Sequence, residues 1–386
     1  MLSHPSVPAL LPVYAQMPLQ PVSGRGSLLF DADGHAWLDA YGGHAVAATG
    51  HCHPTVVRAI CEQAATLLFY STALPHPVRE ALAAELVARC PAPLASVFFC
   101  NSGAEANENA LHLARKQTGR SVIVALEGSF HGRTAATQAL TSGSKYAATA
   151  QRAGMPLGRM VPFDNIAALD AALDDQVAAV ILEPVQGMAG ARACQPEFLA
   201  AARRLCSERG ALLIFDEVQC GVGRTGHFTA AESFGVIPDF ITLAKGLASG
   251  LPIGAMITTS AIAQTVHTGD LGSTFGGGPV PCAAARATLQ VIDDERLLEN
   301  VRRVSDQLRE GALALGPGAV SAVQGRGLLL GLKLTRPATD VQRALFARRI
   351  LTGTSADPGV LRLLPPLSFT PEQASQLLSA LAEVLS

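Results

Sequence analysis

Between residue 46 and about residue 285, short apolar runs alternate with alanine-rich segments of helical periodicity. Alternation of this kind predicts a mostly parallel β-sheet that is covered by helices. We expect strands at 97–100, 122–126, 178–182, 211–216, 240–244 and 253–258, and helices near 55–69, 78–89, 104–117, 196–208 and 279–293. The fold class is therefore α/β, with a large domain built on one such sheet.

The two ends of the chain follow a different pattern, which predicts a smaller α+β domain. Near the start, two apolar runs flank Asp33-Gly34, a dipeptide typical of hairpin turns. Near the end, the strand-like run 327–334 lies between helical segments, and a last helix starts at Pro371. We assign residues 1–45 to an N-terminal segment of the small domain, 46–285 to the large domain, and 286–386 to the C-terminal part of the small domain.

Composition excludes several classes of partner. The 29 basic and 31 acidic residues leave a net charge of −2, whereas a nucleic-acid-binding face needs a basic excess. The uncharged stretch 246–269 is too rich in Gly, Ser, Thr and Pro to cross a bilayer. Only 16% of residues are charged and 49% are apolar, which predicts a large interface with another chain.

The cysteines and histidines predict a reducing compartment and no metal. The eight cysteines form no CxxC pair and no compact cluster, so we expect free thiols and a cytoplasmic location. His44, His51 and His53 are close in sequence, but their spacing matches no established metal-ligand motif.

Two of the expected strands end in residues of opposite charge. Asp216 closes the apolar run from Ala211, and Lys245 closes the run from Phe240. The ends of such strands line the ligand crevice of an open α/β sheet. A lysine there can bind the aldehyde of pyridoxal phosphate (PLP) covalently, and a carboxylate can hold the pyridine nitrogen protonated. This pair predicts a PLP site.

Two glycine-containing segments are candidates for the phosphate of such a cofactor. Residues 101–107 follow a strand and open a helix, whose first N–H groups can face an anion, although Ser102 can equally be a simple N-cap. Residues 272–278 can supply hydroxyl groups from the same subunit or from a partner. The GxGxxG match at 221–226 lacks the acid that a dinucleotide site needs, so we interpret it as a flexible loop beside the site.

An aromatic residue, an arginine and an acid are candidates for the rest of the site. In the segment 130–133, Phe130 can lie on the pyridine ring and Arg133 can bind a substrate carboxylate with two hydrogen bonds. A surface ion pair is the alternative role for Arg133. Glu183 ends another apolar strand, where a buried carboxylate needs a partner. It can pair with an arginine and release it to a second carboxylate, or it can be purely structural.

Taken in order, these segments resemble the class III, fold-type I PLP aminotransferases, and within them the acetylornithine aminotransferase branch. The likeness runs from Leu11 to Pro365. It is carried by five motifs, at 101–108, 130–134, 215–221, 238–245 and 272–277.

The resemblance implies a role for each residue around the cofactor. Lys245 would hold PLP and move the reacting proton, and Asp216 would pair with the pyridinium nitrogen. Phe130 and Val218 would lie on the two faces of the ring, and Gln219 would bind its phenolic oxygen. The phosphate would be bound by Ser102, Gly103 and Ala104, and by Thr274 of the other subunit of a homodimer.

The resemblance also implies two small-molecule substrates. Arg133 would take the α-carboxylate, with Ser273 and Tyr14 beside the substrate. Arg362 would bind the carboxylate of glutamate or 2-oxoglutarate and would be gated by Glu183. The implied reaction transfers an amino group between N-acetylornithine and 2-oxoglutarate, in arginine biosynthesis.

Three departures from the family pattern leave the substrate open. Met188 stands where the family usually has Glu, Gly278 where it commonly has Asn, and Ala104 where many members have Thr. The alternatives are N-succinylornithine, ornithine, γ-aminobutyrate or a carrier-linked lysine as amino donor, or a PLP aminomutase. A binding protein on an inactive PLP fold is disfavoured by the intact pair Lys245 and Asp216.

Overall fold

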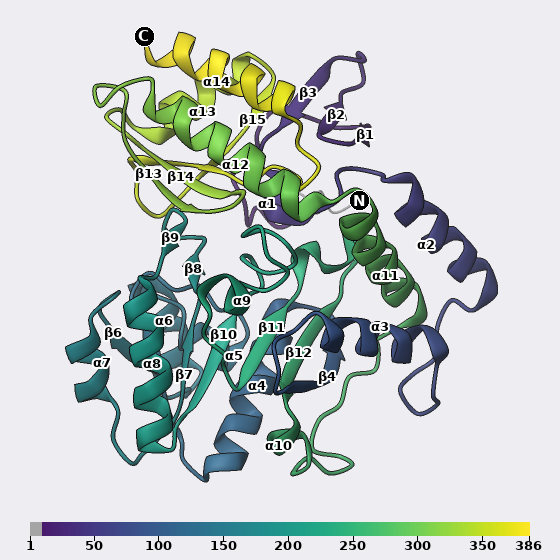
Figure 1. The fold of residues 1–386 in the computed structure, drawn as a ribbon, viewed down its shortest axis with the longest axis vertical. Helices are drawn as coiled ribbons and strands as arrows, with labels where there is room; N and C mark the ends of the chain where they lie inside the picture. Colours follow the sequence, from purple (N-terminus) through teal and green to yellow (C-terminus); the bar gives the residue numbers. More distant parts are fainter. Residues whose placement is uncertain (1–9) are drawn as a thin grey trace, which may run out of the picture.

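A seven-stranded sheet forms the centre of the computed structural model, which describes residues 10–386 (Figure 1). Strand β12 is antiparallel to both of its neighbours, β11 and β4, and the other pairs are parallel. The predicted α/β class and mostly parallel sheet are therefore confirmed. In sheet order the strands are β4 (Leu94–Cys100), β12 (Gly254–Thr259), β11 (Phe240–Leu243), β10 (Leu212–Asp216), β7 (Val177–Leu182), β5 (Val122–Leu126) and β6 (Arg159–Val161).

The helices around this sheet begin and end where local sequence signals place them. Four of the five predicted helices have proline in the first turn, and Ser102 caps the fifth. Gly119 and Gly210 end two of them in the left-handed conformation, at φ 68° and 64°. These helices are α2 (Pro54–Thr66), α3 (Pro77–Ala88), α4 (Gly103–Thr118), α8 (Pro196–Arg209) and α11 (Pro279–Asp294). Shorter elements that we did not expect are α5 (Ala135–Gln138), α6 (Ser144–Arg152), α7 (Ile166–Ala172), α9 (Ala230–Phe234), α10 (Ser260–Ala263), β8 (Val185–Gln186) and β9 (Arg192–Ala193).

The N-terminal strands share a sheet with the C-terminal part of the chain. Strand β3 pairs in parallel with β15, and Figure 1 shows β1–β3 beside α13 and α14. This pairing supports our proposal that the segment 1–45 belongs with residues 286–386; the first nine residues lie outside the described part. The elements are β1 (Ser23–Arg25), β2 (Leu28–Phe30), β3 (Ala36–Asp39), α1 (Gly42–Ala45), α12 (Leu297–Leu313), β13 (Val320–Arg326), β14 (Leu329–Leu334), α13 (Ala338–Ala347), β15 (Ile350–Leu351), β16 (Gly353–Thr354), β17 (Val360–Leu363) and α14 (Pro371–Leu385).

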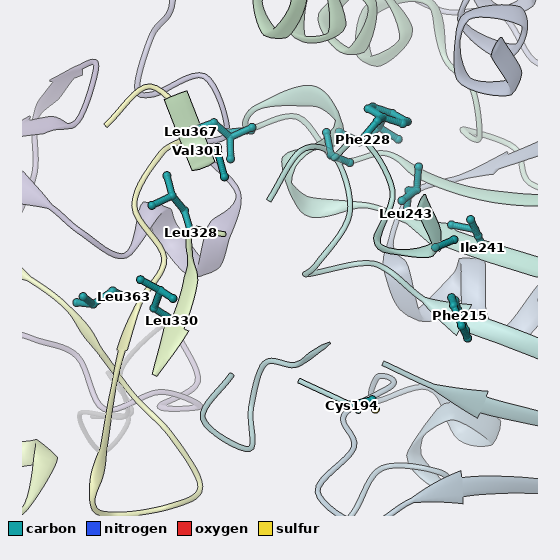
Figure 2. Close-up of a cluster of buried hydrophobic side chains, with 14 of the residues drawn as sticks. Cys194, Phe215, Phe228, Ile241, Leu243, Val301, Leu328, Leu330, Leu363 and Leu367 are labelled. Carbon is teal, nitrogen blue, oxygen red and sulfur yellow. The ribbon is translucent and has the colours of Figure 1, made fainter. Parts of the chain in front are cut away.

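One continuous hydrophobic cluster joins the central sheet to the C-terminal strands. Phe215 and Ile241 from the sheet belong to the same cluster as Leu330 and Leu363 from β14 and β17 (Figure 2). Burial of this apolar surface holds the two parts together. It also fixes β17, the strand that carries Arg362, relative to the strand that ends at Asp216.

The GxGxxG segment is not the flexible loop that we expected. Residues 221–226 are all buried, and the Arg224 guanidinium donates to the backbone carbonyls of Leu328 and Pro365. Burial lowers the pKa of Arg224 to about 9. A buried guanidinium without hydrogen bonds would be costly, so these contacts hold the loop in place. The loop is therefore a packed link to the C-terminal strands.

In the described part of the chain, no helix is both long and apolar enough to span a membrane.

Candidate active site

A hollow of about 460 Å³ opens at the carboxyl ends of the central strands. Because β10 and β11 are parallel neighbours, Asp216 and Lys245 reach the same edge of the sheet, as the strand-end argument predicts. The hollow gathers most of the residues singled out from the sequence, namely Ser102, Gly103, Ala104, Phe130, Arg133, Glu183, Asp216, Val218, Gln219 and Lys245.

Lys245 lies in the hollow in an unusual backbone conformation. It opens the short 3-10 helix Lys245–Ala248 with a φ of 43°, which is costly for a residue other than glycine and is typical of functional sites. Burial lowers the pKa of its ammonium group, while Asp216 and Glu183 oppose that effect. No ion pair among residues 10–386 includes Lys245. Its amine is therefore free for covalent chemistry.

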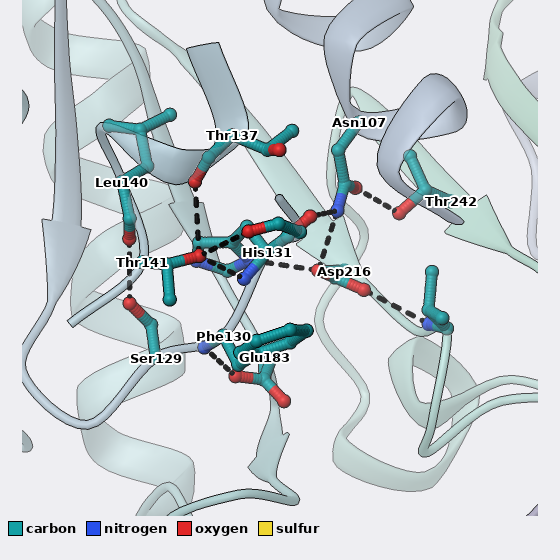
Figure 3. A network of polar contacts seen from close by, with 12 residues as sticks. Asn107, Ser129, Phe130, His131, Thr137, Leu140, Thr141, Glu183, Asp216 and Thr242 are labelled. Carbon is teal, nitrogen blue, oxygen red and sulfur yellow. Dashed lines mark hydrogen bonds and ion pairs between the residues drawn. The ribbon is translucent and has the colours of Figure 1, made fainter. Parts of the chain in front are cut away.

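Asp216 is held by three hydrogen-bond donors (Figure 3). Its Oδ2 accepts from Asn107 Nδ2 at 2.7 Å and from His131 Nδ1 at 2.8 Å, and its Oδ1 accepts from the Val218 N–H at 3.1 Å. Asn107 is itself held, because its Oδ1 accepts from the Thr242 hydroxyl at 2.6 Å. The carboxylate is thus fixed in a buried network.

Sequence reasoning gave no role to Asn107 or His131, although both lie inside motifs that it singled out. A weak signal for Asn107 was available, because it lies one helical turn after Gly103 on the same face of α4. For His131 the available signal was its position next to Phe130. Neither signal indicates that the residue binds Asp216.

The N-terminus of α4 forms one wall of the hollow. Ser102 is the N-cap, with its hydroxyl accepting from the Glu105 N–H at 3.2 Å, and it also lines the hollow. The N–H groups of Gly103 and Ala104 have no acceptor within the helix and can face an anion. A Cβ at Gly103 would lie 2.6 Å from Val218 Cγ2, so this close approach requires glycine.

The polar groups of the hollow fit PLP. The Gln219 side chain has a buried Oε1 with no partner in the described structure, and a Cβ at Gly187 would lie 1.5 Å from that atom. A side-chain amide, a carboxylate, a free amine and the N–H groups of a helix N-terminus together are the polar groups that a phosphorylated pyridine aldehyde needs.

Glu183 and Arg362 contact the same residue rather than each other. Glu183 accepts from the Phe130 N–H at 2.8 Å and from the Gly187 N–H at 3.1 Å. Arg362 Nη1 donates to the Gly187 carbonyl at 3.1 Å, and Arg362 does not line the hollow. Burial, and then the charge of Asp216, raise the pKa of Glu183 to about 7. Gating of Arg362 by Glu183 stays a prediction.

Arg133 has an exposed guanidinium at the edge of the hollow. Its Nη1 donates to the Tyr14 hydroxyl at 2.9 Å, and its Cζ lies 5.4 Å from the centre of the Phe130 ring. Within residues 10–386 it pairs with no carboxylate. The group is therefore available for a carboxylate of a substrate.

The predicted residues Ser273 and Thr274 lie outside the hollow. Ser273 adjoins it through Asn101, whose Nδ2 donates to the Ser273 hydroxyl at 3.2 Å. Thr274 is exposed and is not among the residues that line the hollow of its own chain. The role of Thr274 at a partner's cofactor therefore stays a prediction.

Comparison with known proteins decides the family. The class III aminotransferase profile matches residues 12–385. This chain belongs to the class III aminotransferases. The predicted family is thereby confirmed, as is PLP, the cofactor that the family uses.

Curated relatives and solved structures cover nearly the whole chain of this class III aminotransferase. The acetylornithine aminotransferase of Streptomyces coelicolor is 45% identical over 94% of this chain and 90% of its own length. That of Neisseria meningitidis is 42% identical over 98% and 97%. The ornithine aminotransferase of Toxoplasma gondii has a TM-score of 0.91 at 30% identity, over 98% of this chain and 92% of its own, and its structure is described as showing partial occupancy of PLP at the active site.

Of the three departures from the family pattern, one lines the hollow of this aminotransferase. Ala104 lines the hollow. Met188 is half-buried, and its carbonyl accepts from the Ala356 N–H at 2.9 Å. Gly278 is the N-cap residue of α11 and contributes no side-chain cap there.

Glu217, next to Asp216, is a fully buried acid that sequence reasoning missed. Its Oε1 accepts from the Ala231 N–H at 2.8 Å and its Oε2 from the Ala230 N–H at 2.5 Å. It therefore caps α9 together with Thr229. Burial raises the pKa of Glu217 to about 8. The carboxyl group thus ties α9 to the end of the strand that carries Asp216.

We expect Glu217→Gln to lower the free energy of unfolding by about 1–3 kcal/mol at neutral pH, because the amide NH2 cannot accept from either N–H group, whereas both oxygens of a carboxyl group can. The folded-state pKa of Glu217 is raised from 4.5 to about 8, so the folded state binds an extra proton between these values. The contribution of this group to stability therefore falls as pH rises through that window. Urea unfolding across pH 5–8 should show a shallower fall for the variant, with Glu310→Gln, at an exposed position on α12, as control. An unchanged slope would contradict the assignment.

Proposed function

We propose that this enzyme transfers an amino group from N-acetylornithine to 2-oxoglutarate, giving N-acetylglutamate semialdehyde and glutamate in arginine biosynthesis. The observation that carries the proposal is the pair Lys245 and Asp216 in one hollow with Arg133, which pairs with no carboxylate within residues 10–386. The substrate itself comes from the curated relatives, which are named acetylornithine aminotransferases.

Each group around the cofactor has one task in this proposal. When bound, PLP supplies an aldehyde that receives the amino group and a ring that withdraws electrons. Lys245 would hold the aldehyde and Asp216 the pyridine nitrogen, while Phe130 and Val218 would flank the ring. Gln219 would bind the phenolic oxygen, and the phosphate would lie on Ser102, Gly103 and Ala104.

Lys245 is also the group that moves the reacting proton. A lysine whose pKa is lowered by burial is unprotonated in a larger fraction of molecules at neutral pH, which suits a base. The groups around Asp216 do not need to rearrange during the reaction, because three donors already hold its carboxylate.

Two arginines would recognise the carboxylates of the substrates. Arg133 would take the α-carboxylate, with Tyr14 and Ser273 beside it. Arg362 would take a carboxylate of 2-oxoglutarate, with Glu183 controlling access through Gly187, which both side chains contact.

We infer that the active unit is a homodimer. Phe275 follows Thr274 and is 64% exposed, and its ring centre lies 5.1 Å from that of Phe69. An exposed apolar patch of this kind supports burial against a second copy, which would bring Thr274 to the partner's phosphate. Other large apolar residues near Phe69 in the sequence are also exposed, namely Leu67, Leu68, Tyr70 and Leu74.

All eight cysteines are free, which supports the proposed cytoplasmic location.

A half-reaction identifies the amino donor. The PLP-loaded protein is mixed with N-acetylornithine, N-succinylornithine, ornithine or γ-aminobutyrate without a keto acid, and conversion of the cofactor from its aldehyde to its amine form is followed by absorbance. We expect N-acetylornithine to react at least about tenfold more efficiently than the others, with reversal by 2-oxoglutarate.

Other outcomes of the same experiment point to the alternatives. Preference for N-succinylornithine or ornithine would overturn the assignment of the acetyl group but leave the assignment as an aminotransferase unchanged. If none of the four donors converts the cofactor, the search moves to a carrier-linked lysine or to an aminomutase.

A further inference from the structure

Arg362 is a buried guanidinium that is held entirely by neutral groups. Its Nε donates to the Thr354 carbonyl at 2.7 Å, its Nη1 to the Gly187 carbonyl at 3.1 Å, and its Nη2 to the Tyr41 hydroxyl at 2.8 Å. A guanidinium has five N–H donors. These three contacts leave one N–H on each terminal nitrogen, which is the fork that binds a carboxylate with two hydrogen bonds.

The absence of a side chain at Gly353 leaves room for the Tyr41 ring beside these two N–H groups. Its ring centre lies 5.5 Å from Arg362 Cζ. Gly353 pairs with Arg362 across β16 and β17, and a Cβ at Gly353 would lie 1.9 Å from Tyr41 Cε2. The missing side chain at residue 353 therefore admits the phenol ring.

Hydrogen-bond directions link Tyr41 to His44. An arginine only donates, so the Tyr41 oxygen accepts from Arg362 and its own proton is free to be donated. The acceptor is His44 Nδ1, 3.0 Å away. With Tyr41 as the donor, His44 carries its proton on Nε2 and is neutral. Burial, and then the charges of Arg362, Lys245 and Arg133, lower the pKa of His44, which agrees with the neutral form.

The backbone at His44 is held in a costly conformation. Gly42, Gly43, His44 and Ala45 all have φ between 56° and 67°, so the chain makes a left-handed turn that includes two residues with side chains. Such residues cost free energy and persist where the surroundings demand them. Here the turn brings the imidazole against Tyr41, with ring centres 4.9 Å apart.

We propose that Tyr41 and His44 are a positioning pair for Arg362 that prepares its two free N–H groups for a carboxylate of 2-oxoglutarate. The inference rests on the proposed function, in which Arg362 binds that substrate. His44 fixes the hydroxyl of Tyr41, and the hydroxyl fixes one terminal nitrogen of the guanidinium. Because neither residue is an anion, the charge of Arg362 stays available to the substrate.

Four variants test the pair. Tyr41→Phe keeps the ring and removes the hydroxyl. His44→Gly removes the imidazole at a position where glycine is more favourable for the backbone, so strain cannot explain a loss. His44→Asn keeps an acceptor near Nδ1 and tolerates the left-handed conformation. Gly353→Ala displaces the Tyr41 ring without changing Arg362, Tyr41 or His44.

The readouts are the KM values for both substrates and the Kd of glutarate, a dicarboxylate that cannot react. We expect Tyr41→Phe, His44→Gly and Gly353→Ala to raise the KM for 2-oxoglutarate and the Kd of glutarate about five- to tenfold, the factor that one hydrogen bond is worth. The KM for N-acetylornithine should stay within about twofold. His44→Asn should restore most of the affinity that His44→Gly loses.

The possible failures are distinguishable. If these variants leave glutarate binding unchanged while Arg362→Ala weakens it, the positioning pair is wrong and the proposed function stands. If Arg362→Ala also leaves it unchanged, the role of Arg362 in the proposed function fails. Equal increases in both KM values, or no rescue by His44→Asn, would show a merely structural role and overturn the inference.

Discussion

Lys245→Ala is expected to lower turnover by more than about a thousandfold, the contribution of a positioned acid–base group, and to prevent covalent attachment of PLP. Lys245 is the residue of the hollow whose amine is free of any ion pair within residues 10–386. In the described part of the chain, no other lysine lines the hollow to replace it. The measurements are steady-state turnover and the absorbance of the protein after PLP is added.

The matched control is Lys333→Ala, which removes an exposed lysine from β14. This control should retain wild-type turnover and cofactor absorbance. If Lys245→Ala kept the wild-type rate, the central assignment of the site would be wrong, whatever the family.

Arg362→Ala is expected to raise the KM for 2-oxoglutarate about 100-fold or more. Two hydrogen bonds from a charged donor to a carboxylate are lost, each worth about 1.5–3 kcal/mol. The KM for the amino donor should change by no more than about twofold, since Arg133 takes its carboxylate. Arg133→Ala should instead raise both values.

Initial rates with each substrate varied at saturating levels of the other measure this effect. The control is Arg204→Ala on α8, an exposed arginine in an ion pair with Glu208. An equal rise in both KM values for Arg362→Ala would contradict separate recognition of the two carboxylates.

The central sheet was predictable because its signals are local in the chain. Apolar runs of strand length, prolines that start helices and glycines that end them all act on their near neighbours. For that reason β5 was predicted to the residue, at Val122–Leu126. The direction of β12 was not predictable, because all six of its residues are buried. It therefore lacks the alternation of apolar and polar residues that marks many antiparallel strands.

Short strands and long-range contacts escaped prediction for a related reason. Strands β15 and β16 have only two residues each and exist because β3 and β17 provide their pairing partners. The segment 221–226 resembled a flexible loop because its glycines suggest mobility, whereas burial against Leu328 and Pro365 decides its state.

By itself, the sequence determined the fold class, the family and the strand-end pair of Lys245 and Asp216, because each is written in contiguous motifs. Only the tertiary structure decided what surrounds them. Asn107 lies 109 residues from its partner Asp216, and Tyr41 lies 321 residues from Arg362. Hydrogen bonds over such separations depend on how the strands and helices pack, and no local pattern in the chain encodes which donor will meet which acceptor.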